Sequence, residues 1–128
     1  MNNPSNLPPP AKAPSVLFGG KNSYKSWLNV YKKFPKPERF GLGYKIDCLF
    51  IELLENLLVA RYASPLQRTA SLELAISKID KIKFLLEIAW ENKLLASRQH
   101  GELLDQLQSL GRMLGGWKKG IDNKNSRT

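Results

Sequence analysis

The segment IDCLFIELLENLL, residues 46–58, has the clearest helical pattern in the chain and decides the fold class. Its apolar residues recur at alternating steps of three and one, which places them on one wide face of a helix: Ile46, Leu49, Phe50, Leu53, Leu54, Leu57 and Leu58. Asp47, Glu52 and Glu55 take the opposite, solvent-facing side. The pattern predicts an amphipathic helix over residues 38–62 that buries one face against neighbouring helices.

A second helical segment follows at once. Ser64 can cap a helix, Pro65 suits the first helical position and Gln67 completes a capping-box pattern. The apolar stripe after this start consists of Leu72, Ala75, Ile76, Ile79, Ile82, Leu86, Ala89 and Trp90, and neighbouring faces carry Leu74, Leu85 and Ile88. Because this helix is apolar on more than one side, we expect it to contact more than one neighbour, within the bundle or in another subunit.

The C-terminal segment predicts a further helix, which Ser97 can cap. Apolar residues recur there at steps of four, three, four, three and four, which is a heptad seam: Leu103, Leu107, Leu110, Leu114, Trp117 and Ile121. Gly111, Gly115 and Gly116 lie beside the seam, although each glycine weakens an isolated helix by about 0.8–1 kcal/mol relative to alanine. We therefore expect the backbone of a neighbouring helix to approach these glycines closely.

The N-terminal segment has a different composition. Residues 1–20 hold five prolines and close with Gly19-Gly20, so we expect a flexible, proline-rich leader. A short first helix should follow, capped by Ser23 and stopped by Pro35 and Pro37. Its apolar face gathers Tyr24, Trp27, Leu28 and Tyr31.

These segments together predict an all-α, up-and-down four-helix bundle with a short first helix, because no segment has the alternation of a strand. We expect a leader over residues 1–20, the bundle over residues 21–122 and a polar tail over residues 123–128. No run approaches the roughly 18–20 apolar residues that span a bilayer, and the first residues lack a secretory-signal pattern. We therefore expect no membrane contact and a cytoplasmic location.

Residues suited to catalysis are scarce, since the chain has one cysteine, Cys48, and one histidine, His100. Cys48 falls on the first apolar stripe, where we expect a buried thiol acting as a small hydrophobe. His100 falls in the first turn of the last helix, where we expect it in solvent. A single cysteine excludes an intramolecular disulfide and a multi-cysteine zinc site. The sequence predicts no enzymatic activity, no metal and no cofactor.

The charge balance points to an acidic partner. Lys and Arg number 20 against 11 Asp and Glu, a formal net charge of +9. The excess lies at the two ends of the chain, while residues 46–97 are nearly balanced. Such basic surfaces attract polyanions by releasing counterions, without reading sequence. The alternative is a merely soluble basic protein whose charge has no binding role.

Eight basic residues are candidates for phosphate contacts: Lys32, Lys33, Lys36, Arg39, Lys45, Arg112, Lys118 and Lys119. The first four crowd the turn after the first helix, and Lys45 follows about two turns into the next segment. The last three lie late in the last helix. In an up-and-down bundle these two groups fall at opposite ends, which favours binding along a length over binding in one pocket. Arg39 and Arg112 could instead cap or brace a helix end.

Two further stretches have a distinctive sequence: FPKPERFGLG, residues 34–43, and LGRMLGGW, residues 110–117. They resemble two signatures of the Avd family, the accessory variability proteins of diversity-generating retroelements. The first is similar to that family's FPK-x-x-RF-x-LG turn, and the second to its GR-hydrophobic-LG-small-W stretch. The resemblance covers roughly residues 24–121. The proline-rich leader is not part of the family core.

The resemblance implies a bundle that assembles as a pentameric barrel and binds RNA or DNA. It also implies binding to the retroelement's reverse transcriptase and support of mutagenic cDNA synthesis, without polymerase activity of its own. Two alternatives stay open. The chain could be a ribosomal-RNA intervening-sequence protein, which shares the bundle, or another structural or protein-interaction bundle.

Overall fold

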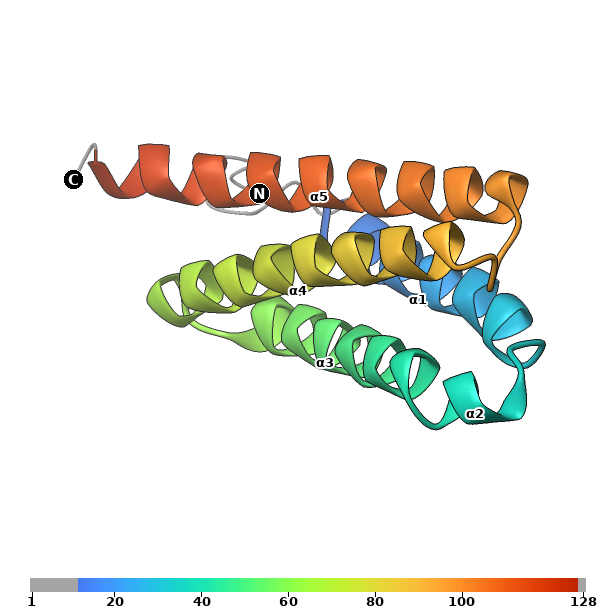
Figure 1. Ribbon diagram of the computed structural model, residues 1–128. Helices are drawn as coiled ribbons and strands as arrows, with labels where there is room; N and C mark the ends of the chain where they lie inside the picture. Colours follow the sequence, from blue (N-terminus) through green and yellow to red (C-terminus); the bar gives the residue numbers. More distant parts are fainter. Residues whose placement is uncertain (1–11, 127–128) are drawn as a thin grey trace.

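Figure 1 shows the computed structural model of the chain, which describes residues 12–126. Its helices are α1 (Lys12–Tyr31), α2 (Lys36–Arg39), α3 (Leu42–Tyr62), α4 (Pro65–Glu91) and α5 (Ser97–Ser126). Over residues 12–126 there is no strand. The four long helices alternate in direction, so the predicted all-α, up-and-down bundle is confirmed.

The prediction of a short first helix is wrong, because α1 begins at Lys12 and runs for 20 residues. Pro14 sits in its first turn, where a backbone N–H would have no partner within the helix, so the proline costs little there. Ser23 lies inside the helix and does not cap it; its hydroxyl donates to the carbonyl oxygen of Gly20 at 2.8 Å. Residues 1–11 of the expected leader lie outside the described residues.

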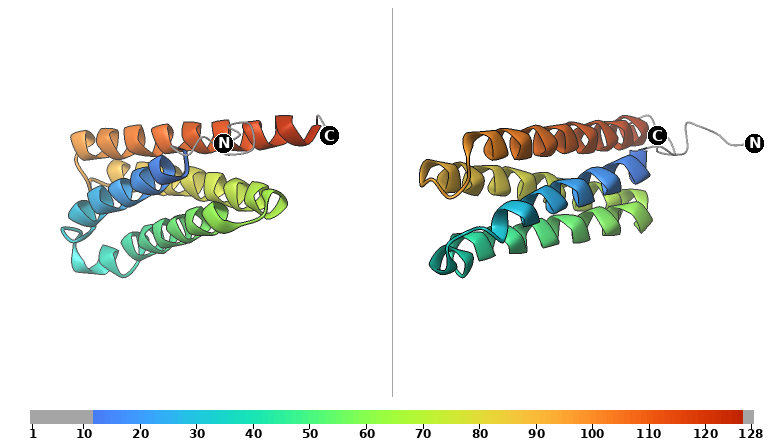
Figure 2. Two further views of the ribbon diagram at one scale, coloured as in Figure 1. Left: turned by 180° about the vertical axis from the view of Figure 1, so that it is seen from behind. Right: turned by 90° about the vertical axis from the view of Figure 1, so that its right-hand side faces the viewer.

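Close packing explains the glycine pair in α1. A Cβ on Gly20 would lie 2.6 Å from Leu57 Cδ1 on α3, and one on Gly19 would lie 3.3 Å from Met113 Cε on α5. Figure 2 shows α1 lying between these two helices. Gly19 and Gly20 therefore let α1 sit close to both neighbours.

The close approach predicted for the glycines of the last helix is wrong within the described chain. A Cβ built on Gly111, Gly115 or Gly116 would meet nothing within 4 Å. These glycines lie on or next to the outer surface of α5, while the seam residues face the core. Spacing along the sequence cannot tell which of several glycines another helix approaches.

The apolar stripes form the core largely as predicted. On α3 the exceptions are Leu54, which is half-buried, and Leu58, which is 53% exposed. On α4, Ile76 is half-buried and Leu74 and Trp90 lie on the surface, and on α5 Ile121 is half-buried. The remaining buried members are Ile46, Leu49, Phe50, Leu53, Leu57, Leu72, Ala75, Ile79, Ile82, Leu86, Ala89, Leu103, Leu107, Leu110, Leu114 and Trp117.

An aromatic cluster joins α1 to α3. The Trp27 ring is fully buried and stacks with Tyr31 at 5.1 Å and with Phe50 at 5.8 Å between ring centres. Its Nε1 donates to Asp47 Oδ1 at 3.1 Å. Asp47 is therefore half-buried, and the prediction that it faces solvent is wrong. Leu28, expected on the face of Trp27, is 41% exposed.

Several helix ends differ from the sequence prediction. Ser64 caps α4 as expected, accepting a hydrogen bond from the Gln67 backbone N–H at 3.5 Å. Ser97 does not cap α5; the Gln99 side chain instead accepts from the Ala96 N–H at 2.8 Å. The helix predicted from residue 38 begins at Leu42, after the separate turn α2.

The C-terminal boundary also moves, because α5 continues to Ser126 through most of the expected polar tail, and residues 127–128 lie outside the described part. None of the described helices combines the length and the apolar character needed to span a membrane.

The two glycine environments predict opposite effects of substitution. Gly20→Val should lower the free energy of unfolding by about 1–3 kcal/mol, because the added methyl groups overpack the contact with Leu57. Gly116→Ala should raise it by about 0.5–1 kcal/mol, because the site is open and alanine favours the helix. Urea denaturation of both variants measures the difference. If Gly20→Val were as stable as the parent chain, the close packing of α1 on α3 would be wrong.

Candidate nucleic-acid interface

A tight corner connects α1 to α3 and positions the first basic group; we call residues 31–44 the α1–α3 corner. The Tyr31 hydroxyl donates to the backbone carbonyl oxygen of Arg39 at 2.9 Å, which ties the end of α1 to the end of α2. Gly43 packs beneath this link, since a Cβ there would lie 2.7 Å from Tyr31 Cε1 and 3.0 Å from the Glu38 carbonyl oxygen. The corner is thus held by packing on its inner side.

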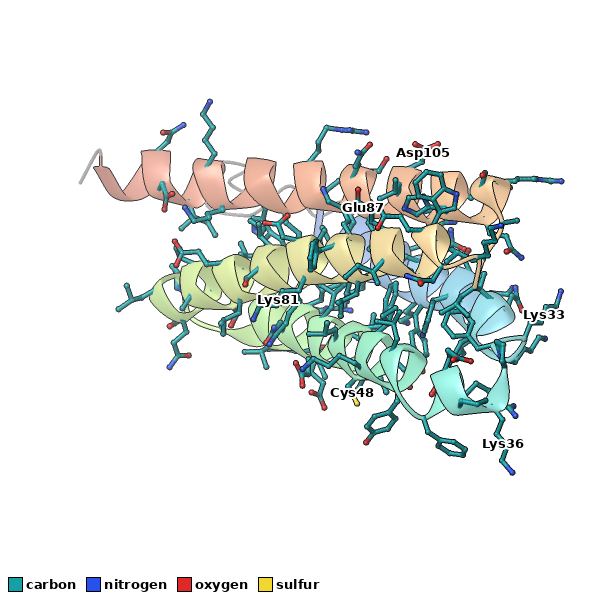
Figure 3. All side chains as sticks on the ribbon, viewed as in Figure 1. Lys33, Lys36, Cys48, Lys81, Glu87 and Asp105 are labelled. Carbon is teal, nitrogen blue, oxygen red and sulfur yellow. The ribbon has the colours of Figure 1, made fainter. Side chains whose placement is uncertain are left out.

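Four of the basic residues predicted to contact phosphates lie on the outer side of this corner. Lys32, Lys33, Lys36 and Arg39 are exposed, and none has an ion-pair partner within the described residues. Figure 3 shows Lys33 and Lys36 pointing away from the bundle at one end. The fifth, Lys45, is exposed on the first turn of α3. The hydrogen bond from Lys78 lowers the pKa of Glu52, and the charge of Lys45 lowers it further. Lys45 is therefore partly balanced by a carboxylate.

The loop between α4 and α5 adds two basic residues at this end that the sequence reasoning missed. Figure 1 places this loop at the same end of the bundle as the α1–α3 corner. The loop carries Lys93, whose backbone is left-handed with φ 62°, and Arg98 follows at the start of α5. Arg98 pairs with Glu102 at 3.2 Å. The alternating helix directions could have identified both residues, because the first and third connections of such a bundle share one end.

A row of lysines on α1 extends the basic surface from the corner. Lys21 and Lys25 are exposed on α1 at a step of four. Lys32 directly follows the helix, seven residues after Lys25, and its N–H donates to the Leu28 carbonyl, so the three share one face. Because α1 begins at Lys12, Lys21 and Lys25 lie along its middle, which joins them to the corner.

The second predicted group lies along α5, toward the end away from the corner, as expected. Lys118 is already paired with Asp122 at 3.1 Å and Glu73 at 3.5 Å, and the hydrogen bond to Asp122 raises its pKa. Arg112 donates from Nη2 to Ser109 Oγ at 3.2 Å, and Lys119 is exposed. Phosphate contacts by this group stay a prediction. Fewer of its basic side chains lack an ion-pair partner than at the corner, because Lys118 is paired.

The predicted environments of Cys48 and His100 are both wrong. Cys48 is half-buried, and a hydrogen bond with it raises the pKa of Tyr44. His100 is buried, because its ring stacks on Trp90 with 4.9 Å between ring centres. Over the described residues, no group of three or more His, Cys, Asp and Glu side chains is placed to hold a metal ion.

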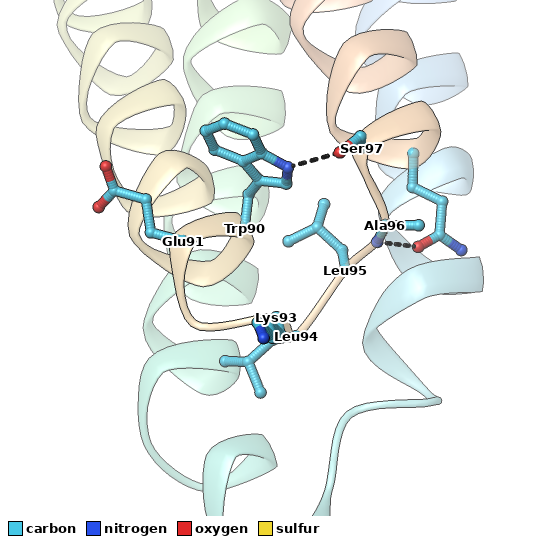
Figure 4. Close-up of a pocket in the computed structure, with 8 residues that line it drawn as sticks. Trp90, Glu91, Lys93, Leu94, Leu95, Ala96 and Ser97 are labelled. Atoms are coloured by element: carbon cyan, nitrogen blue, oxygen red, sulfur yellow. Dashed lines mark hydrogen bonds between the residues drawn. The ribbon is translucent and has the colours of Figure 1, made fainter.

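The surface beside this ring stack is hollowed. A pocket of about 680 Å³ lies at the α4–α5 loop and is lined in part by Trp90, Leu95 and Ser97. Trp90 Nε1 donates to Ser97 Oγ at 3.0 Å across it (Figure 4). Ser97 therefore braces the loop. It does not cap α5 because it is already the first residue of that helix, and Ala96 takes the position before it.

Comparisons with known proteins give one family and one fold. A family model described as bAvd-like matches residues 22–121. The chain is also similar to the crystal structure of a protein of unknown function from the S23 ribosomal protein family of Bacteroides thetaiotaomicron VPI-5482. That match has a TM-score of 0.78 at 16% identity and covers 84% of this chain and 98% of the other, so it shows the fold alone. No curated protein sequence matches the chain.

The Tyr31 link predicts a measurable contribution to stability. Tyr31→Phe removes the hydrogen bond to the Arg39 carbonyl and leaves the ring stack with Trp27, so the free energy of unfolding should fall by about 0.5–1.5 kcal/mol. Urea denaturation compares this variant with the parent chain. A Tyr31→Phe variant as stable as the parent chain would show that the link does not hold the corner.

Proposed function

This chain belongs to the bAvd-like family, and from that membership we propose that it is a non-catalytic accessory protein of a diversity-generating retroelement. In this role it binds nucleic acid and the element's reverse transcriptase and supports mutagenic cDNA synthesis. The reverse transcriptase supplies the chemistry. The accessory chain supplies a charged surface that holds the RNA or DNA near the polymerase.

The observation that carries the proposal is the unbalanced basic surface at the α1–α3 corner. Lys32, Lys33, Lys36 and Arg39 point outward without ion-pair partners in the described part of the chain. Lysine and arginine that neutralise phosphates release condensed counterions, which drives binding without reading base sequence. Such a surface suits an accessory subunit that must hold templates of any sequence.

We further propose that the chain functions as a homo-oligomer, with the pentamer of the family as the expected state. The supporting observation is an exposed row on the outer face of α3, formed by Tyr44, Ile51, Leu58 and Tyr62 at steps of seven, seven and four. These side chains are 41–74% exposed. Several large apolar side chains exposed along one helix are typical of a contact surface, so we infer that a second copy covers this row.

The alternative is a structural bundle of the ribosomal-RNA intervening-sequence type. The likeness to a protein from the S23 ribosomal protein family favours it, although at 16% identity only the fold is shared. The two candidates differ in their surroundings. A reverse transcriptase gene with a template repeat beside this gene supports the retroelement role, and a location inside a ribosomal-RNA gene supports the alternative.

Oligomer formation can be measured by light scattering at micromolar concentration. The parent chain should have about five times the 14.5 kDa mass of one copy. Leu58→Glu should shift the mass toward one copy, because a carboxylate in a dry interface loses its hydration without gaining a partner. Leu74→Glu is the matched control, since Leu74 is 54% exposed, as Leu58 is at 53%, but lies on α4 and not on α3. A parent chain with the mass of one copy would contradict the oligomer.

Salt dependence tests the nucleic-acid interface. For the double variant Lys32→Ala/Lys33→Ala, affinity for RNA or DNA should fall for all sequences alike. The slope of log affinity against log salt should become shallower by roughly 0.7–0.9 for each contact removed. Lys118→Ala/Lys119→Ala removes the same charge elsewhere and should have a smaller effect, because Lys118 is already paired. Unchanged affinity and slope in both variants would leave the basic surface without a nucleic-acid role.

A further inference from the structure

A small open pocket lies within the basic surface of the corner. It has a volume of about 370 Å³ and is lined by Leu28, Tyr31, Lys32, Arg39 and Phe40. Three of these side chains are apolar or aromatic, two are cations and none is a carboxylate. We call this feature the corner pocket.

We propose that the corner pocket binds an unpaired base of single-stranded nucleic acid, with the neighbouring phosphates held by Lys32 and Arg39. This inference rests on the proposed nucleic-acid binding and adds the form of nucleic acid that is bound. A base inside a duplex has both faces covered by its neighbours, whereas an unpaired base can stack on protein side chains. The pocket therefore selects single strands.

The side chain proposed to stack on the base is Phe40. Its ring is 74% exposed, although burial of a phenylalanine side chain would normally stabilise the fold. An exposed ring beside two cations is the arrangement found where proteins bind single strands, because the ring stacks on a base while the cations follow the backbone. The planar guanidinium of Arg39 can hold a phosphate through two hydrogen bonds.

The pocket is held in shape before any ligand arrives. Its inner wall is Tyr31, which stacks on the buried Trp27 ring and donates its hydroxyl to the Arg39 carbonyl. The Phe40 backbone N–H donates to the Pro37 carbonyl at 3.3 Å. A preformed site loses little conformational entropy on binding, which favours affinity.

Charge favours a nucleic acid over a second copy of this chain as the occupant. Each copy carries a net charge of +9, and the pocket itself presents Lys32 and Arg39. Two such surfaces repel each other, whereas a polyanion is attracted. The apolar row on α3 provides a separate face for contacts between copies.

The test uses the full chain and a single-stranded oligonucleotide that carries the fluorescent base 2-aminopurine. Phe40→Leu keeps an apolar side chain of similar size but removes the aromatic face. We expect affinity to fall about fivefold or more, the order found for loss of one stacked base, and quenching of 2-aminopurine to weaken. The salt slope should not change, because no charge is removed.

Two controls isolate the stacking contribution. Phe84→Leu makes the same replacement at a phenylalanine that is 61% exposed on α4, and it should bind as the parent chain does. An oligonucleotide with abasic sites keeps every phosphate and removes the bases. The parent chain and Phe40→Leu should bind it equally.

Three results would overturn the proposal. One is that Phe40→Leu binds and quenches like the parent chain while the lysine variants still change the salt slope; the surface then binds phosphates without a base pocket. Another is that Phe40→Leu changes the oligomer mass and leaves quenching intact, which makes the pocket a contact between copies. The third is that the parent chain binds neither single strands nor duplexes, which removes the proposed function as well.

Discussion

The buried indole of Trp27 is the contact on which the arrangement of α1, α3 and the corner between them depends. Its two faces meet Tyr31 and Phe50, and its Nε1 bonds to the Asp47 carboxylate. Leaving that buried N–H without a partner would cost about 1–3 kcal/mol, so the hydrogen bond fixes how α1 rotates against α3. Because Tyr31 lies on this stack, its hydroxyl reaches the Arg39 carbonyl and closes the corner.

Because α1 packs on α3 through Trp27, its two faces have different environments. Gly19 and Gly20 face the bundle and let α3 and α5 come close, while Lys21 and Lys25 face outward and continue the charge of the corner. The positive charge of α1 therefore lies on the face of the helix that does not pack into the core. The outer face of α3 carries an apolar row instead, so one surface attracts polyanions and another suits protein contacts.

Periodicity predicted the parts of the fold that lie in long helices. The stripe of residues 46–58 and the seam from Leu103 to Trp117 became core because many regularly spaced residues point the same way. The start of α1 could not be predicted, since several prolines and a glycine pair within residues 1–20 are typical of a loop. Pro14 costs little in the first turn of a helix, and packing against α3 and α5 offsets the weak helix preference of Gly19 and Gly20. For the site, the corner cations followed from the sequence. The corner pocket could not be predicted, because it forms only when the turn after α1 brings Leu28 and Phe40 to the lining of one hollow.

Hydrogen–deuterium exchange of the full chain, with and without a single-stranded oligonucleotide, tests most directly the claim that the α1–α3 corner is the nucleic-acid interface. The account predicts slower exchange over residues 28–45 when the oligonucleotide is bound, because the backbone of α2 and its flanking turns lies beneath the contacting side chains. Slower exchange confined to the C-terminal half of α5, with residues 28–45 unchanged, would contradict it.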